Sequence, residues 1–238
     1  MTVLVGVVVG GLLVAQNVAR AERIEEADDV AADYLSEVST FRADIATALR
    51  EAGDDPGALR AALRKSSAEP PTLAEADPAG IEESTTYARA LQVQGSLLDP
   101  YRELAQDLKA ADEGLTWVAA AREVLSLRAS DYVEGYLLTD SGQVRSSLIP
   151  AFVRARDRLA AVPVPEGQDR LAATVSTAVQ TVIDRATQLA ASIEQGSSYT
   201  FSYSDVYQAA TTALNDYATQ VDGDLTEALN ATADLAEE

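Results

Sequence analysis

Apolar side chains recur at gaps of three and four residues from Ile24 to Ala52, and this spacing is the feature that most restricts the fold. Such gaps place side chains along one face of an α-helix, whereas a strand alternates its faces with every residue. The stripe consists of Ile24, Ala27, Ala31, Tyr34, Leu35, Val38, Phe41, Ile45, Ala48, Leu49 and Ala52, and the acidic residues Glu25, Glu26, Asp29, Asp33, Glu37 and Asp44 largely take the other positions. The pattern predicts one helix about 43 Å long. The segment 53–57, with two Gly and one Pro, should end it.

The same pattern returns along the chain between segments rich in Pro, Gly and Ser. Helical segments are expected at 58–65, 84–111, 115–138, 144–159, 168–195 and 204–235, with Ser204 as the N-cap of the last one. Three prolines make residues 66–80 a surface loop. We expect Asp99-Pro100 to kink or split the second long helix, and Gly114 to permit a break after it.

These segments predict an all-α fold, an elongated antiparallel helical bundle with an N-terminal membrane-anchor helix. Long helices joined by short polar loops pack along narrow seams of Ala, Leu, Val and Tyr. The chain has 238 residues, which is compatible with one such domain. We therefore expect an acidic helical bundle domain over residues 20–238, with the Pro-rich segment 162–167 as the candidate sub-boundary.

The N-terminal segment, residues 1–19, is expected to be a membrane anchor or a signal segment. The run from Met1 to Ala15 carries no charged side chain. It falls short of the roughly 17 to 25 residues that cross a hydrocarbon core as a helix, although residues 16–19 could extend it into the interface. A buried core helix is disfavoured, because a surface helix of a soluble domain would show a polar face.

Two features bear on how this segment is used. Ala19-Arg20-Ala21 fits the small-x-small pattern of a signal cleavage site, which leaves a secreted protein cut after Ala21 as an alternative. The heptad-like pattern begins directly at Ile24, with no turn residue between, and this favours an uncleaved anchor that continues into the long helix. Arg20 and Arg23 follow the run and no basic residue precedes it, so a charge count alone would place the body in the cytoplasm. A start assigned too far downstream would remove a basic leader, so the count does not fix the orientation.

Composition excludes several classes of function. The chain contains no His and no Cys, which removes disulfides, thiolate and imidazole chemistry and nearly every kind of zinc site. Its formal charge is −20, so nucleic acid is not an expected partner, because binding phosphates requires clustered cations. No phosphate-binding Gly-rich loop or nucleophile elbow occurs in the sequence. We therefore expect a protein that is not an enzyme and carries no cofactor and no metal.

Clustered carboxylates keep one chemical alternative open. The pairs Glu25 with Asp29 and Asp29 with Asp33 are one helical turn apart and could flank a hydrated cation. Without a third converging oxygen ligand, a solvated acidic face is the expected arrangement. A carboxylate-based cation binder or enzyme therefore remains an alternative, and it requires acidic side chains that converge at one point.

Four aromatic residues gather just before the last helix and form the candidate protein-interaction surface: Tyr199, Phe201, Tyr203 and Tyr207. Tyr and Phe supply large contact area at low entropic cost, so an exposed group of them suits a binding surface. Alternatively, the rings cap the end of the helical core. We favour the cap and keep the surface as the only candidate site.

The segment Gly135-Tyr136-Leu137-Leu138-Thr139-Asp140-Ser141-Gly142, followed by Leu148, Pro150, Ala151 and the run from Arg154 to Leu159, resembles a turn of extracytoplasmic helical sensor domains. Those domains are four-helix bundles of bacterial chemoreceptors, histidine kinases and cyclases, attached through a first membrane helix. The similarity covers roughly 30 residues, and Gly and Asp are displaced from the family's Gly-Tyr-Leu-Leu-Thr-Gly-Asp pattern. The resemblance implies a sensory or interaction bundle outside the membrane, and it assigns no ligand residue.

Together these features predict a noncatalytic, membrane-anchored helical bundle on the extracytoplasmic face, acting as a sensory, accessory or protein-interaction module. Its expected partners are the membrane, through the N-terminal helix, and another protein or a second copy of itself. The secreted protein cleaved after Ala21 is the first alternative.

Overall fold

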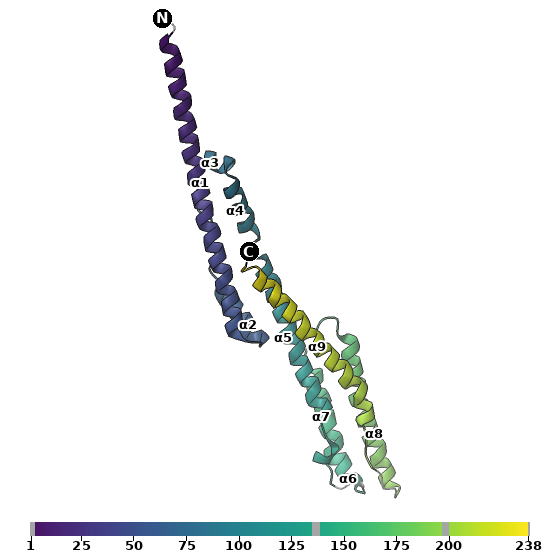
Figure 1. The fold of residues 1–238 in the computed structure, drawn as a ribbon. Coiled ribbons are helices and arrows are strands. Elements are labelled where there is room, and N and C mark those ends of the chain that lie inside the picture. The colour runs from purple at the N-terminus through teal and green to yellow at the C-terminus, as the bar shows by residue number, and fades with distance from the viewer. Residues whose placement is uncertain (1–2, 135–138, 197–199, 238) are drawn as a thin grey trace. The chain divides into compact units, whose positions relative to one another are not determined.

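The computed structural model describes residues 3–134, 139–196 and 200–237, with side chains described from residue 17 onward. Every regular element in these ranges is a helix, which confirms the predicted all-α class. The elements are α1 (Val3–Ala52), α2 (Pro56–Ser66), α3 (Pro78–Glu83), α4 (Thr85–Ser96), α5 (Asp99–Leu125), η1 (Ala129–Asp131), α6 (Ser141–Gln143), η2 (Val144–Leu148), α7 (Ile149–Ala160), α8 (Asp169–Glu194) and α9 (Ser204–Asp234). Figure 1 labels α1 to α9.

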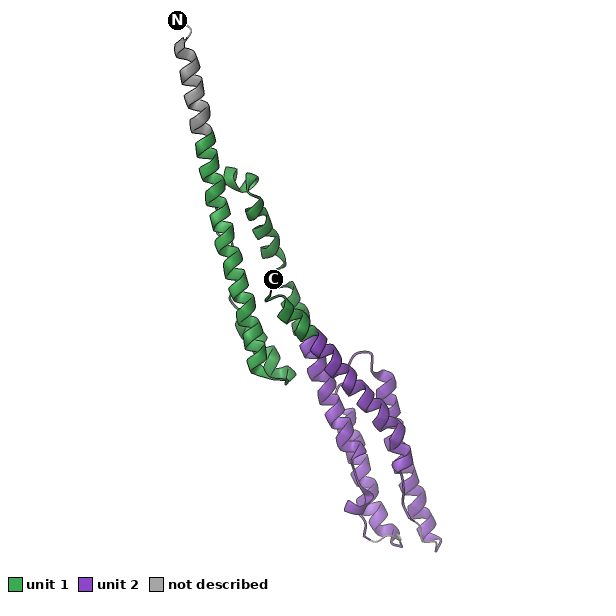
Figure 2. Ribbon diagram, viewed as in Figure 1, with its two compact units in different colours: residues 1–106, 228–238 green, residues 107–227 purple. Residues whose placement is uncertain are grey.

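Contacts divide the chain into two compact units (Figure 2). Unit 1 comprises residues 1–106 and 228–238, and unit 2 comprises residues 107–227. The boundaries fall within α5 and within α9. The candidate sub-boundary at 162–167 lies inside unit 2, where it forms the linker between α7 and α8.

The helix α1 organises unit 1. Its buried side chains follow the predicted gaps of three and four residues: Ala27, Ala31, Tyr34, Val38, Phe41, Ile45 and Leu49. Gly53 follows the helix with a φ of 77°, a conformation that costs glycine little, so the helix ends where the sequence predicted. The helices α2, α3 and α4 all pack against α1.

A short helix and an extended segment return the chain along α1. Asp55 caps α2 by accepting a hydrogen bond from the N–H of Ala58 at 2.7 Å. Residues 67–77 then lead to α3, which lies beside the segment of α1 that contains Arg20 and Arg23. The hydroxyl of Tyr87 donates to the carbonyl of Ala74 at 2.8 Å and holds this segment in place.

The contact between α3 and α1 is unusually close at Gly80. A Cβ at this position would lie 2.8 Å from the carbonyl carbon of Arg23, so only glycine fits there. Ser84 then begins α4, accepting from the N–H of Tyr87 at 2.8 Å and donating to Asp28 of α1 at 2.6 Å. Because 67–77 carries the chain back along α1, α4 runs parallel to α1, where an antiparallel neighbour was expected (Figure 1).

The second long helix is split near Pro100, as predicted. The helix α4 ends at Ser96 and α5 begins at Asp99. Leu91, a large apolar residue of α4, is 47% exposed. The predicted break at Gly114 is wrong, because α5 continues through it. A Cβ at Gly114 would lie 2.7 Å from the hydroxyl oxygen of Tyr217, so this glycine permits close packing of α5 against α9.

The helix expected at 115–138 ends much earlier, at Leu125, and a short 3-10 turn follows at Ala129–Asp131. Residues 135–138, which belong to the segment that resembles sensor domains, lie outside the described residues. The described part of that segment begins a helix. Asp140 accepts hydrogen bonds from the N–H groups of Gly142 and Gln143, and helical residues continue to Ala160.

A π-helical turn, η2, ends at Leu148, two residues before Pro150, in this helix. Proline lacks an N–H and crowds the preceding turn of an α-helix, so the wider turn accommodates it. The helices α8 and α9 agree with their predicted ranges, although α9 begins at Ser204 itself, so the N-cap prediction is off by one residue. Gly223 does not interrupt α9.

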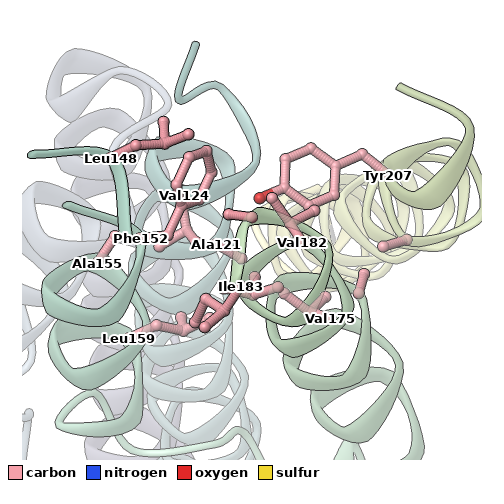
Figure 3. Close-up of a cluster of buried hydrophobic side chains, with 14 of the residues drawn as sticks. Ala121, Val124, Leu148, Phe152, Ala155, Leu159, Val175, Val182, Ile183 and Tyr207 are labelled. Carbon is pink, nitrogen blue, oxygen red and sulfur yellow. The ribbon is translucent and has the colours of Figure 1, made fainter. Parts of the chain in front are cut away.

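Side chains from four helical segments meet in the core of unit 2. Ala121 and Val124 come from α5, Leu148 and Phe152 from η2 and α7, Val182 and Ile183 from α8, and Tyr207 from α9 (Figure 3). Trp117 and Phe152 are the largest side chains that are almost fully buried, at 1% and 0% exposure. Unit 2 therefore has a continuous hydrophobic core.

The predicted anchor stays a prediction. The backbone of α1 is helical from Val3, but the side chains of residues 1–16 lie outside those described. Within the part of the chain that the structure does describe, no helix combines the length and the apolar character needed to cross a membrane.

Candidate functional site

A groove of about 910 Å³ lies in unit 2, between the end of α5 and the beginning of α9. One wall is formed by residues 125–128, and the other by residues 201–205 together with Tyr207, Gln208, Thr211 and Thr212. Three of the four predicted site residues, Phe201, Tyr203 and Tyr207, line this groove. The fourth, Tyr199, lies outside the described residues.

Tyr203 fixes the turn that forms the first wall. Its hydroxyl donates a hydrogen bond to the carbonyl of Leu127 at 2.6 Å and accepts one from the N–H of Ala129 at 2.9 Å. One phenol therefore satisfies two backbone groups that the end of α5 would otherwise leave without partners. This contact explains why the helix stops at Leu125, in a sequence that has neither Gly nor Pro nearby.

The aromatic rings are packed against one another. The ring centroid of Tyr203 lies 5.3 Å from that of Phe201, 5.2 Å from that of Tyr207 and 5.6 Å from that of Phe152. The contacts with Tyr207 and Phe152 are edge-to-face, an arrangement that aromatic pairs favour. Tyr203 therefore joins the floor of the groove to the core of unit 2.

The three rings differ in exposure. Tyr207 is 6% exposed and belongs to the core, whereas Phe201 and Tyr203 are partly buried and pack on its surface. This arrangement agrees with rings that cap the core, and it leaves the partly exposed faces of Phe201 and Tyr203 on the groove. Whether the patch binds a protein stays a prediction.

Burial also sets the ionisation of the two tyrosines. Removal from water raises the pKa of the Tyr203 hydroxyl, and it raises the pKa of Tyr207 further, because burial opposes the charged phenolate. A hydrogen bond from the backbone of Ala129 acts in the opposite direction on Tyr203. Both groups are therefore neutral phenols at pH 7.

The rim of the groove is polar. Arg185 on α8 forms a two-pronged ion pair with Asp205, with both N–O distances at 3.0 Å. The hydrogen bonds from Arg185 lower the pKa of the Asp205 carboxyl below its ordinary value of 3.8. Arg128 is exposed on the opposite wall. The rim therefore offers a cation at Arg128 together with the hydroxyl and amide groups of Ser126, Gln208, Thr211 and Thr212.

The groove thus combines a partly apolar floor with a polar rim. A partly apolar floor with hydrogen-bonding groups along its edge suits an extended segment or a small molecule with both apolar and polar parts. The wall at 125–128 was missed by sequence reasoning, because the regular apolar spacing continued past Leu125. Its position depends on a contact with a tyrosine 76 residues further along the chain.

The carboxylates considered as cation ligands lie elsewhere. Glu25, Asp29 and Asp33 are exposed on α1, as are the other acidic residues of that face. Among the side chains that the structure describes, no group of three or more Asp and Glu is placed to hold a metal ion.

Comparison of the chain with protein-family models, curated proteins and solved structures finds no match.

Proposed function

We propose that this chain is a noncatalytic helical module that is anchored to a membrane through its N-terminal segment and engages another protein on the extracytoplasmic side. The observation that carries the interaction role is the groove of unit 2, with Phe201 and Tyr203 on its floor and a polar rim. The apolar run at residues 1–15 supports the anchor, and the resemblance of residues 135–142 to sensor domains supports a sensory or accessory role.

The geometry of the groove favours recognition of a protein segment. Tyr203 is held by two hydrogen bonds and three ring contacts, so the floor is ordered before a partner arrives. A preorganised surface loses little conformational entropy on binding. Aromatic side chains and arginine are also the residues that most often dominate binding energy at protein interfaces, and Arg128 and Phe201 supply both.

Site-specific crosslinking in cells tests the interaction. A photoreactive residue in place of Gln208, on the groove wall, is expected to give a discrete protein adduct, whereas one in place of the exposed Thr226, on the same helix, is not. Phe201→Ala, added to the variant with the photoreactive residue at position 208, should reduce the yield of the protein adduct at least fivefold, because it removes one ring of the groove floor. Equal adducts at both positions, or an adduct insensitive to Phe201→Ala, would contradict the proposal.

The absence of cysteine makes the location directly testable. The single substitutions Thr47→Cys and Ala209→Cys place one exposed thiol in each unit. A membrane-impermeant maleimide added to intact cells is expected to label both variants in the membrane fraction. Labelling only after lysis would refute the extracytoplasmic location. A labelled product in the medium whose N-terminus follows Ala21 would instead establish the secreted form.

A further inference from the structure

A second, smaller cavity lies in unit 2, among residues of α5, α7 and α8 and the linker between α7 and α8. Its volume is about 340 Å³, within the range of about 300 to 1,000 Å³ typical of small-molecule sites. The apolar lining includes Trp117, Leu159, Val162, Val164, Ala172 and Val179. Val164 is 43% exposed, although it is a large apolar residue, so the cavity opens at a surface that remains partly apolar.

The fluorescence of Trp117 can report binding of a molecule in this cavity. It is the only tryptophan in the sequence, and it is 1% exposed. Its position in the cavity wall means that a molecule bound there would lie against a ring already shielded from water.

The polar end of the cavity is set by Arg156. Its Nε and Nη2 donate to Asp157 Oδ1 at 3.0 and 2.8 Å, and its Nη1 donates to Gln180 Oε1 at 2.9 Å. Gln180 in turn donates to Asp184 at 2.9 Å. A guanidinium has five N–H groups, so two of them have no partner in the described part of the chain. Arg156 therefore brings to the cavity lining a hydrogen-bond donor whose positive charge is already balanced by Asp157.

We infer that this cavity is a binding site for a small neutral molecule with a hydrocarbon tail and one oxygen acceptor, such as a medium-chain alcohol or ketone. The apolar walls favour the tail, and the free N–H groups of Arg156 favour the oxygen. A carboxylate is disfavoured for two reasons. Asp157 already pairs with the guanidinium, and the formal charge of −20 repels anions from the whole chain.

Titration of the full chain with 1-hexanol, 1-heptanol and 1-octanol tests the inference through Trp117 fluorescence. Each added methylene is expected to lower Kd about fourfold until the cavity is full, because burial of one methylene contributes about that factor. Octanoate at pH 7 should bind at least tenfold more weakly than 1-octanol. Octanoate binding as tight as that of 1-octanol, or no dependence on chain length, would overturn the inference.

A pair of variants on α8 tests the location of the site. Ser176→Phe places a large side chain at an exposed position of the cavity rim, and Gln188→Phe places the same side chain at an exposed position of α8 outside the lining. The first is expected to raise the Kd for 1-octanol at least tenfold, and the second to leave it unchanged. Equal responses of both variants would overturn the inference, with circular dichroism as the check that both are folded.

This site is separate from the groove, so its test does not depend on the proposed protein interaction. Phe201→Ala, which should weaken the crosslink at the groove, is expected to leave binding of 1-octanol unchanged.

Discussion

In unit 1 the buried side chains come from one face of α1 and from the shorter helices and the start of α5 that pack on it, whereas in unit 2 four helical segments contribute to a shared core. Unit 1 relies on close fit at single positions, such as Gly80 against Arg23 and Ser84 between Asp28 and Tyr87. Unit 2 contains Trp117 and Phe152, the two largest of the described side chains that are less than 2% exposed. Truncation of a buried side chain should therefore lower the free energy of unfolding most in unit 2. Addition of atoms at a close contact should lower it most in unit 1.

The largest effect is expected from Phe152→Ala in unit 2. Phe152 is 0% exposed and contacts the ring of Tyr203, so truncation leaves a cavity at the centre of the core. Such a change typically lowers the free energy of unfolding by about 3 to 5 kcal/mol. Urea unfolding of the variant measures it. Val153→Ala, at the partly exposed neighbouring position, is the control, and an equal loss in both variants would mean that the core does not dominate the stability of unit 2.

An intermediate effect is expected from Gly80→Ala in unit 1. The added methyl group would meet the backbone of Arg23, which cannot move as a side chain can, so the free energy of unfolding should fall by about 1 to 3 kcal/mol. Hydrogen exchange of the amides at 77–87 should become faster, because α3 can no longer seat against α1. Gly95→Ala is the matched control, since a Cβ at Gly95 meets nothing within 4 Å and should leave exchange unchanged or slower. If hydrogen exchange at 77–87 is unchanged in Gly80→Ala, the close contact at Gly80 does not stabilise the packing of α3 on α1.

The smallest effect concerns the ion pair between Arg185 and Asp205. The pKa of Asp205 is lowered in the folded protein, so its contribution to stability is present above its ordinary pKa of 3.8 and is lost as the pH falls through the folded value. Arg185→Gln should therefore be less stable than the parent at pH 7, and the difference should shrink as the pH falls from about 5 towards 2. Urea unfolding at several pH values measures this difference. Both groups are accessible to solvent, so the effect is small, and a difference independent of pH would show that the pair contributes nothing.

The sequence predicted local features of both units well. The apolar gaps of α1, its end at Gly53, the split near Pro100 and the range of α8 follow from propensities and spacing of residues that are close in sequence. The failures have a common cause. Gly114 was expected to permit a break, but it lies inside α5, where a Cβ would come within 2.7 Å of the hydroxyl oxygen of Tyr217 on α9. The early end of α5 likewise depends on Tyr203.

The candidate groove shows the same limit. The aromatic wall could be found from sequence, because Phe201, Tyr203 and Tyr207 stand out in a chain with few aromatic residues. The opposite wall could not, because residues 125–128 carry no pattern that distinguishes them from a continuing helix. Spacing within one segment predicts which face is buried, but it does not predict which distant segment will cover that face.

The hydroxyl of Tyr203 also has a consequence for how unit 2 assembles. It bonds to Leu127 and Ala129, which precede it by 76 and 74 positions, so these bonds close a long loop of chain. Contacts of this range form late, because the entropy lost in closing the loop must be overcome before they stabilise anything. Helices α5, α7 and α8 can pair through nearer contacts first, and we expect the groove to be among the last parts of unit 2 to appear during refolding.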